Sequence, residues 1–136
     1  MKALIYCRVS SDRQALDGHG IESQEQRCRN RAHDKGYSVA RVFPDEGVSG
    51  GLFERPGMKE MIGYIDSHPG EQYVVIFDDL SRFARDLKVH IQLKAEFKSR
   101  DVKLECLNFD FEESEESEYA EMILAACNQY QRKQNK

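Results

Sequence analysis

Near its start the chain reads Ile5-Tyr6-Cys7-Arg8-Val9-Ser10-Ser11, an apolar segment that ends in a cation and two hydroxyl groups. The apolar residues from position 4 to position 9 predict a short buried strand. Arg8 lies at the carboxyl end of this strand, and an arginine is seldom buried without partners. In open α/β sheets ligands bind at the carboxyl ends of strands, so Arg8 and Ser10 are candidate site residues. Taken alone, they also fit an exposed corner between a strand and a loop.

The next part of the chain predicts a helix and a second strand. A polar loop over 11–20 leads into a helix over 21–35. This helix should end at Gly36, because glycine readily adopts the left-handed conformation that follows a helix. Its apolar stripe is sparse, so we expect the helix to be thinly packed and peripheral. Residues 37–43 indicate a strand that should stop at Pro44, since proline cannot donate to a sheet.

The rest of the core continues this alternation. Apolar residues at helical spacing predict a helix over 58–65, with Pro56 in its first turn. Residues 73–77 form an unbroken apolar run, which is typical of a parallel strand covered on both faces. A helix over 89–100 and a strand over 102–107 follow. The sequence therefore predicts an α/β fold, with a mainly parallel central sheet flanked by helices.

The last residues differ in charge and pattern. Seven acidic residues and no Lys or Arg lie between Asp110 and Glu121, although the formal charge of the whole chain is only −4. A helix is predicted over 116–136, with its acidic residues suited to its N-terminus. This helix is apolar over more than one face, so we expect it to contact a second protein surface, the alternative being that it docks on its own domain. Its main stripe comprises Tyr119, Met122, Ile123, Ala126 and Tyr130.

Composition excludes several classes of protein. The 136 residues suit one domain, and the acidic balance argues against a protein that simply coats nucleic acid. The four cysteines are far apart and lack a Cys-x-x-Cys pair, so neither a zinc site nor a redox dithiol is indicated. The opening apolar run is too short for a signal peptide or a membrane span. We expect a cytoplasmic protein with reduced thiols.

Arginine and hydroxyl side chains recur where the predicted strands end. Arg8 and Ser10, a long loop over 45–57 and residues 81–85 should gather along one edge of the sheet. Guanidinium groups stay charged and repel one another, so such a site should bind an anion, most simply a phosphodiester. At ~4 Å and an effective dielectric constant of about 20, each arginine–phosphate pair contributes roughly 4 kcal/mol before desolvation. Metal-free phosphoryl transfer is therefore a reasonable reaction for this edge.

A phosphoryl transfer of this kind needs a nucleophile. Ser10 is the first candidate because it follows Arg8 by two residues on the same face of an extended segment. The nearby cation would lower the cost of forming an alkoxide. Ser11, Ser49 and Ser81 are the rival candidates on the residues alone.

Three motifs resemble a known family when taken together. They are Tyr6-Cys7-Arg8-Val9-Ser10-Ser11, then Ser49-Gly50 with Arg55-Pro56-Gly57, and then Leu80-Ser81-Arg82-Phe83-Ala84-Arg85-Asp86. In this order and spacing they resemble the catalytic domain of the serine site-specific recombinases, the resolvase/invertase family. The resemblance covers essentially the whole chain. It implies a catalytic core over 1–115 and a long helix from 116 that makes dimer and tetramer contacts.

The resemblance also implies an activity and its residues. In this family a serine attacks the DNA backbone, which gives a 5′-phosphoseryl enzyme and a free 3′-hydroxyl, and Ser10 matches that serine. Arg8, Arg82 and Arg85 match the arginines that bind and activate the scissile phosphate. Supporting positions are assigned to Gln14, Ser49, Arg55, Ser81 and Asp79. The implied partners are double-stranded DNA and further copies of the chain, forming a dimer that assembles to a tetramer, with no metal or other cofactor.

The chain departs from the family pattern at several places. Ser81 stands where many members carry Asp, which leaves the acid/base assignment open, with Asp79 nearby. Gln131 stands where Glu is frequent. Family members continue into a separate DNA-binding domain, which we expect to be absent from a chain that ends at Lys136. The insertion over 16–20 favours the branch of the large serine recombinases.

Two other functions remain as alternatives on the sequence. One is a catalytically inactive relative that acts as a self-association or DNA-accessory module. The other is a small-molecule phosphoesterase on a flavodoxin-like fold.

Overall fold

The described residues form a four-stranded sheet with the strand order β2-β1-β3-β4. The structure is a computed structural model that describes residues 1–9, 20–47, 54–83 and 87–109. All three strand pairings are parallel, as the sequence predicted. The strands are β1 (Lys2–Val9), β2 (Ser38–Glu46), β3 (Tyr73–Phe77) and β4 (Lys103–Cys106).

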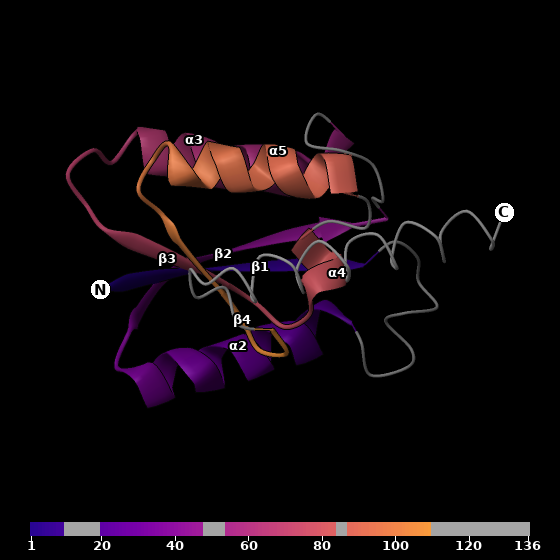
Figure 1. Ribbon diagram of the computed structural model, residues 1–136. Coiled ribbons are helices and arrows are strands. Elements are labelled where there is room, and N and C mark those ends of the chain that lie inside the picture. Colours follow the sequence, from indigo (N-terminus) through magenta and orange to yellow (C-terminus); the bar gives the residue numbers. More distant parts are fainter. Residues whose placement is uncertain (10–19, 48–53, 84–86, 110–136) are drawn as a thin grey trace, which may run out of the picture.

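Helices cover both faces of this sheet (Figure 1). Helix α2 (Ile21–Lys35) lies on one face, and α3 (Pro56–Asp66) and α5 (Leu87–Lys98) lie on the other. The short helix α4 (Leu80–Phe83) follows β3 almost directly, at the carboxyl end of the strands. The described part of the chain is therefore a three-layer α/β fold, as expected from alternating strands and helices.

Strand β1 is buried on both faces because side chains alternate along a strand. Leu4 and Tyr6 belong to the apolar cluster beneath α3 and α5. Ala3, Ile5 and Cys7 belong to the cluster beneath α2. The strand that carries the first sequence motif is thus the centre of both cores.

Local signals predicted several element boundaries correctly. Helix α2 begins at Ile21 and ends at Lys35, and Gly36 follows it with a left-handed φ of 76°. The N–H of Gly36 caps the carbonyls of Ala32 and His33, as a glycine at this position commonly does. Pro56 opens α3, where its missing N–H costs nothing.

Two expectations about the neighbours of β1 are wrong. Helix α2 is not peripheral, because Cys28 and Ala32 are fully buried and α2 forms one whole layer. These two small residues belong to one buried apolar cluster with side chains of β1 and β3, including Ile5 and Ile76. Pro44 does not stop β2, which continues to Glu46. Since β2 is an edge strand, a proline can face away from β1 without removing a ladder hydrogen bond.

The expected oligomerisation helix over 116–136, with its apolar stripe, lies outside the described residues. Among the described residues, no helix combines the length and apolar character needed to cross a membrane.

Candidate active site

Arg8 is buried at the carboxyl end of β1, with only 1% of its surface exposed. Its guanidinium reaches α4, where Nε donates to the carbonyl oxygen of Arg82 over 3.2 Å and a terminal nitrogen donates to the carbonyl oxygen of Ser81. Carbonyls in the last turn of a helix lack partners within the helix, so they are natural acceptors for this cation. Arg8 therefore ties the end of β1 to the segment that follows β3.

Gln24 of α2 holds the main chain of Arg8. The N–H of Arg8 donates to Gln24 Oε1 over 2.9 Å, and Gln24 Nε2 donates to the carbonyl oxygen of Arg8 over 3.0 Å. The pairing of β1 with β3 ends at Ile5 and Ile76, and among the described residues no strand pairs with the end of β1 on that side. The fully buried Gln24 amide takes the place of that missing strand.

Asp45, near the end of β2, anchors the start of α3. Its carboxylate accepts hydrogen bonds from the N–H groups of Gly57 (2.7 Å) and Met58 (3.1 Å) and from the hydroxyl of Tyr6 (2.7 Å). A carboxylate at this position satisfies N–H groups that the helix leaves unpaired and complements the helix dipole. A Cβ on Gly57 would lie 2.5 Å from the carbonyl oxygen of Pro44, so only glycine allows this close approach.

The position of α3 brings Arg55, the residue before the helix, to the same backbone carbonyl that Arg8 contacts. Arg55 is 1% exposed, and a terminal nitrogen donates to the carbonyl oxygen of Arg82 over 3.4 Å. Burial raises the pKa of Tyr6 well above its ordinary value, while the Arg55 guanidinium opposes this rise and the Asp45 carboxylate adds to it. Tyr6 therefore remains a neutral donor to Asp45.

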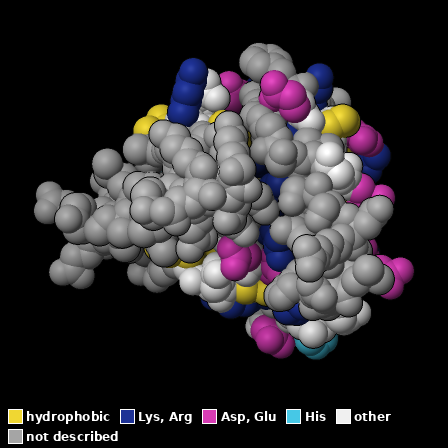
Figure 2. All heavy atoms as spheres, turned by 90° about the vertical axis from the view of Figure 1, so that its right-hand side faces the viewer, with side chains coloured by type: hydrophobic (Ala, Val, Ile, Leu, Met, Phe, Trp, Pro, Cys, Tyr) yellow, Lys and Arg dark blue, Asp and Glu magenta, His cyan; other side chains and the backbone are white. Residues whose placement is uncertain are grey.

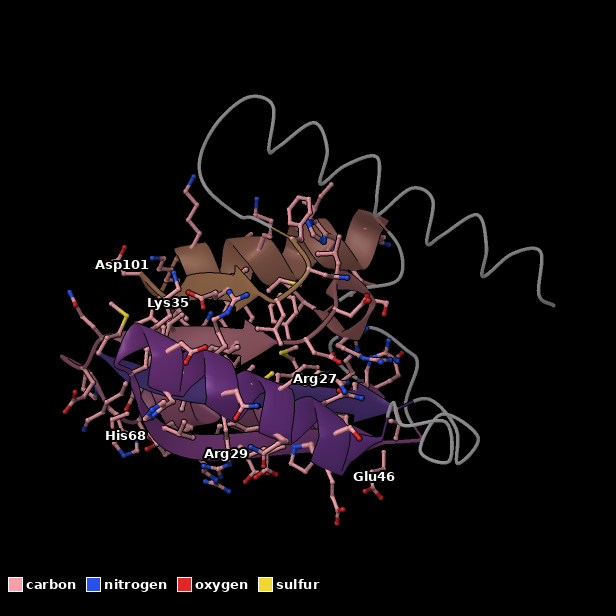
Figure 3. All side chains as sticks on the ribbon, turned by 90° about the horizontal axis from the view of Figure 1, so that it is seen from below. Arg27, Arg29, Lys35, Glu46, His68 and Asp101 are labelled. Carbon is pink, nitrogen blue, oxygen red and sulfur yellow. The ribbon has the colours of Figure 1, made fainter. Side chains whose placement is uncertain are left out.

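Arg82 is held by an acidic residue that follows β3. Its Nε donates to Asp78 Oδ1 over 3.2 Å, and Asp78 Oδ2 accepts from Arg27 of α2 over 2.6 Å. Figure 3 shows Arg27 and Arg29 on different sides of α2. Only Arg27 reaches Asp78 among the described residues, whereas Arg29 pairs with Glu25 on α2 itself.

Asp79 caps α4. Its Oδ1 accepts the N–H of Ser81 over 2.9 Å, and its Oδ2 accepts Nδ2 of Asn108 over 2.9 Å. The N–H of Arg82 donates to the carbonyl oxygen of Asp79 over 2.9 Å. Asp79 thus fixes the start of α4, and within the described part of the chain it contacts no arginine side chain through a hydrogen bond or ion pair.

The structure brings together some of the predicted site residues. Those that meet at one point are Arg8, Arg55, Ser81 and Arg82, with Asp79 at the start of the same helix. Those that lie outside the described residues are Ser10, Gln14, Ser49 and Arg85. Figure 2 looks onto this end of the molecule, where Lys and Arg side chains appear beside acidic ones in the part not covered by grey atoms.

Sequence reasoning missed four residues that build this cluster: Arg27, Gln24, Asp45 and Asp78. Asp78 directly follows β3 and Asp45 lies near the end of β2, so the strand-end rule that singled out Arg8 applies to both. Gln24 precedes Cys28 by four residues and so lies on the same buried side of α2. This spacing could have identified Gln24 from the sequence. For Arg27, which is half-exposed, the sequence carried no comparable signal.

The cysteines near this end are buried free thiols. Burial is the main cause that raises the pKa of Cys7 to about 12, and the Asp78 carboxylate adds to the rise. Cys28 and Cys106 are also buried and free. Within the described ranges, no group of three or more His, Cys, Asp or Glu side chains could hold a metal ion.

The chain is similar to known proteins in both sequence and fold. The family described as "Resolvase, N terminal domain" matches residues 3–136. A protein of Bacillus subtilis (strain 168) named "Putative DNA recombinase" is 30% identical over 128 residues, which are 94% of this chain. The chain spans 25% of the length of that relative.

Two solved structures share the fold and a similar level of identity. The N-terminal catalytic domain of TP901-1 integrase is 29% identical with a TM-score of 0.75, and the match covers 100% of both chains. The C-terminal catalytic domain of ISC1926 TnpA, an IS607-like serine recombinase, is 29% identical with a TM-score of 0.65. That match covers 79% of this chain and 70% of the other.

Proposed function

Because this chain belongs to the resolvase family, as a serine recombinase catalytic domain, we propose that it recombines DNA at specific sites by cleaving and rejoining strands. The covalent intermediate is a 5′-phosphoserine on Ser10. The partners are double-stranded DNA and further copies of the chain, which form a dimer that assembles to a tetramer on DNA. The proposed contacts between copies use Tyr119, Met122, Ile123, Ala126 and Tyr130.

One observation carries this proposal: three buried arginines from separate segments converge at the carboxyl edge of the sheet. Arg8 and Arg55 both donate to the carbonyl oxygen of Arg82. A guanidinium cannot lose its proton in a protein, so this cluster stays cationic and favours an anion. A DNA phosphodiester is an anion whose charge and oxygens suit arginine donors.

Chain connectivity keeps the proposed nucleophile close to these cations. Ser10 follows Arg8 by two residues, so their Cα atoms are separated by at most about 7 Å. Arg85 follows Arg82 by three residues, which limits that separation to about 11 Å. The proposal requires both side chains to reach the same phosphate, and this spacing allows it.

The reaction is an exchange of phosphodiesters. The oxygen of Ser10 forms a bond to phosphorus, the bond from phosphorus to the 3′-oxygen breaks, and the 3′-oxygen takes a proton. Arg8, Arg82 and Arg85 stabilise the added negative charge of the transition state. Because one phosphodiester replaces another, the reverse attack by a 3′-hydroxyl rejoins DNA without a nucleotide cofactor.

The remaining residues support this site. Asp79 holds the start of α4, which carries Ser81 and Arg82. We assign Gln14 and Ser49, with Arg55, to phosphate binding around the reacting group.

A suicide DNA duplex tests the proposal. The duplex carries a nick next to the cleaved bond, within a recombination site identified by sequencing the junctions that form in cells expressing the protein. The expected result is a covalent protein–DNA adduct with the parent protein and with Ser11→Ala, and none with Ser10→Ala. An adduct that persists in Ser10→Ala, or no adduct with the parent protein, would overturn the proposal.

A further inference from the structure

Asp78 is an acidic residue placed between two arginines at the edge of the sheet. Its two carboxylate oxygens accept from Nε of Arg82 (3.2 Å) and from a terminal nitrogen of Arg27 (2.6 Å). The Asp78 side chain is 7% exposed, and that of Arg27 is 42% exposed. A buried carboxylate needs such partners, because an unpaired buried charge is strongly destabilising.

The contact with Asp78 fixes one side of the Arg82 guanidinium. Within the described ranges, this is the only hydrogen bond that the Arg82 side chain donates. A guanidinium is planar and holds its N–H groups in fixed directions, so an occupied Nε sets where the two terminal nitrogens point. Those nitrogens are the groups that can bind two oxygens of one phosphate.

The main chain of Arg82 is fixed from the other side. Its carbonyl oxygen accepts from Arg8 and Arg55, and its N–H donates to the carbonyl of Asp79. With the backbone anchored, the remaining freedom lies in the long side chain, which loses rotamer entropy when it binds a ligand. Asp78 removes much of that freedom before the ligand arrives.

Arg27 prevents Asp78 from cancelling the charge of Arg82. One carboxylate shared by two guanidiniums leaves the group of three with a net charge of +1. Without Arg27, Asp78 and Arg82 would form a neutral pair with little attraction for a phosphate. Arg27 comes from α2, the helix that also holds the main chain of Arg8 through Gln24.

We propose that Asp78 is a positioning residue that orients the Arg82 guanidinium toward the scissile phosphate, and that Arg27 holds Asp78 while keeping the group cationic. This inference rests on the proposed function, because it names what prepares one arginine of that site for DNA. It assigns helix α2 a part in strand cleavage, through Arg27.

Single-turnover cleavage of the suicide duplex tests the effect on rate. Asp78→Ala should cleave about 10- to 100-fold more slowly, since small displacements of a binding group have effects of this size. Asp78→Asn keeps an acceptor for Nε and should recover most of the rate. Arg27→Ala should be slower than the parent protein, whereas Arg29→Ala, two residues along the same helix, should cleave at the parent rate.

A double-mutant cycle separates positioning from a general structural role. If Asp78 acts through Arg82, Asp78→Ala should have almost no further effect on cleavage in an Arg82→Ala background. If the two residues acted independently, the fold-losses in cleavage rate of the single variants would multiply in the double variant. Multiplied losses would overturn the inference, as would parent-like cleavage by Asp78→Ala alone.

A measurement without DNA tests the positioning itself. In ¹⁵N NMR spectra of the protein, Arg82 Nε–H should give a signal protected from exchange with water. This signal should be lost in Asp78→Ala and retained in Arg29→Ala. A signal that survives Asp78→Ala would overturn the inference whatever the protein does to DNA, whereas a parent protein that forms no adduct would overturn the proposed function alone.

Discussion

Two regions of this protein use arginine differently. At the far ends of α3 and α5, Arg100 is partly buried and pairs with the carboxylates of Asp66 (2.7 Å) and Glu96 (2.7 Å), which are more exposed. At the carboxyl edge of the sheet, Arg8 and Arg55 are buried, and both donate to the backbone carbonyl of Arg82. The first arrangement cancels charge and links two helices.

In the second region, the contacts with α4 leave the arginine charge in place. Carbonyl oxygens are neutral acceptors, so Arg8 is fixed in place by the contacts to α4 without losing its positive charge to them. An arginine held in this way can still attract an anion, whereas one paired with two carboxylates has little charge left to offer. These neutral acceptors distinguish Arg8 from Arg100, and at Arg82, whose acceptor Asp78 is acidic, Arg27 restores the positive charge.

The largest expected effect comes from removing Arg8. Arg8→Ala should lower the cleavage rate by at least about 100-fold, because a donor to the transition state is lost. It should also destabilise the fold by about 1–3 kcal/mol, since buried carbonyls lose their donor. Suicide-duplex kinetics and urea unfolding measure the two effects.

Arg100→Ala is the matched variant in the other region. Its carboxylate partners Asp66 and Glu96 are 54% and 41% exposed, so unfolding should become easier by only about 1 kcal/mol, and cleavage should not change. Equal losses of cleavage in the two variants would remove the distinction between the regions.

Gly57→Ala tests the packing of α3 against β2, which positions Arg55. Gly57→Ala places a methyl group 2.5 Å from the carbonyl oxygen of Pro44 and 2.9 Å from Asp45 Oδ1. Overpacking of this kind should destabilise the protein by about 1–3 kcal/mol and slow cleavage through Arg55.

Gly63→Ala, in the same helix, is the control for Gly57→Ala. A Cβ at Gly63 meets no atom within 4 Å, so this change should stabilise the helix by roughly 0.5–1 kcal/mol. Thermal unfolding of both variants gives the comparison, and a stabilised Gly57→Ala would contradict the close approach.

The two regions should also respond to opposite ends of the pH scale. Burial raises the pKa of Cys7 from 9.0 to about 12. Because the folded pKa is the higher one, the stability linked to this thiol is complete below pH 9 and is lost as pH rises from there toward 12. The loss should approach about 1.4 kcal/mol per pH unit. Urea unfolding of Cys7→Ala should show a shallower alkaline decline than the parent protein does, and identical slopes would contradict the assignment.

The smallest effect is expected at Asp66. The hydrogen bond from Arg100 is the main cause that lowers the pKa of this carboxyl below 3.8. Its contribution to stability is therefore present above that pH and is lost as the solution becomes more acidic. Asp66→Asn should flatten the acid limb of the stability curve slightly at low salt. Added salt should abolish the difference, because exposed charges are screened, and a difference that persists in high salt would indicate a buried interaction.

Sequence reasoning located the elements of the fold better than it located the contacts within the site. The ends of α2 and the run of β3 followed from local signals, namely the glycine at position 36 and an unbroken apolar segment. Strand β2 continues through Pro44 because it lies at the edge of the sheet. No local sequence pattern indicates that position.

The site shows the same limit. Arg8 and Arg82 were identified from motifs, and the structure places them in contact. The parts played by Gln24 and Asp78 depend on partners that are distant in the chain: Arg8 lies 16 residues from Gln24, and Arg27 lies 51 residues from Asp78. A buried polar residue reveals its role only when its partner is known, so the sequence alone could not supply it.

The central claim is that the buried arginines keep their charge for a DNA phosphate. The most direct test compares cleavage of a normal phosphodiester with cleavage of a methylphosphonate, which lacks the negative charge, by the parent protein and by Arg82→Ala. The account predicts that Arg82→Ala loses about 100-fold or more on the phosphodiester and far less on the methylphosphonate. Equal losses on the two substrates would contradict it.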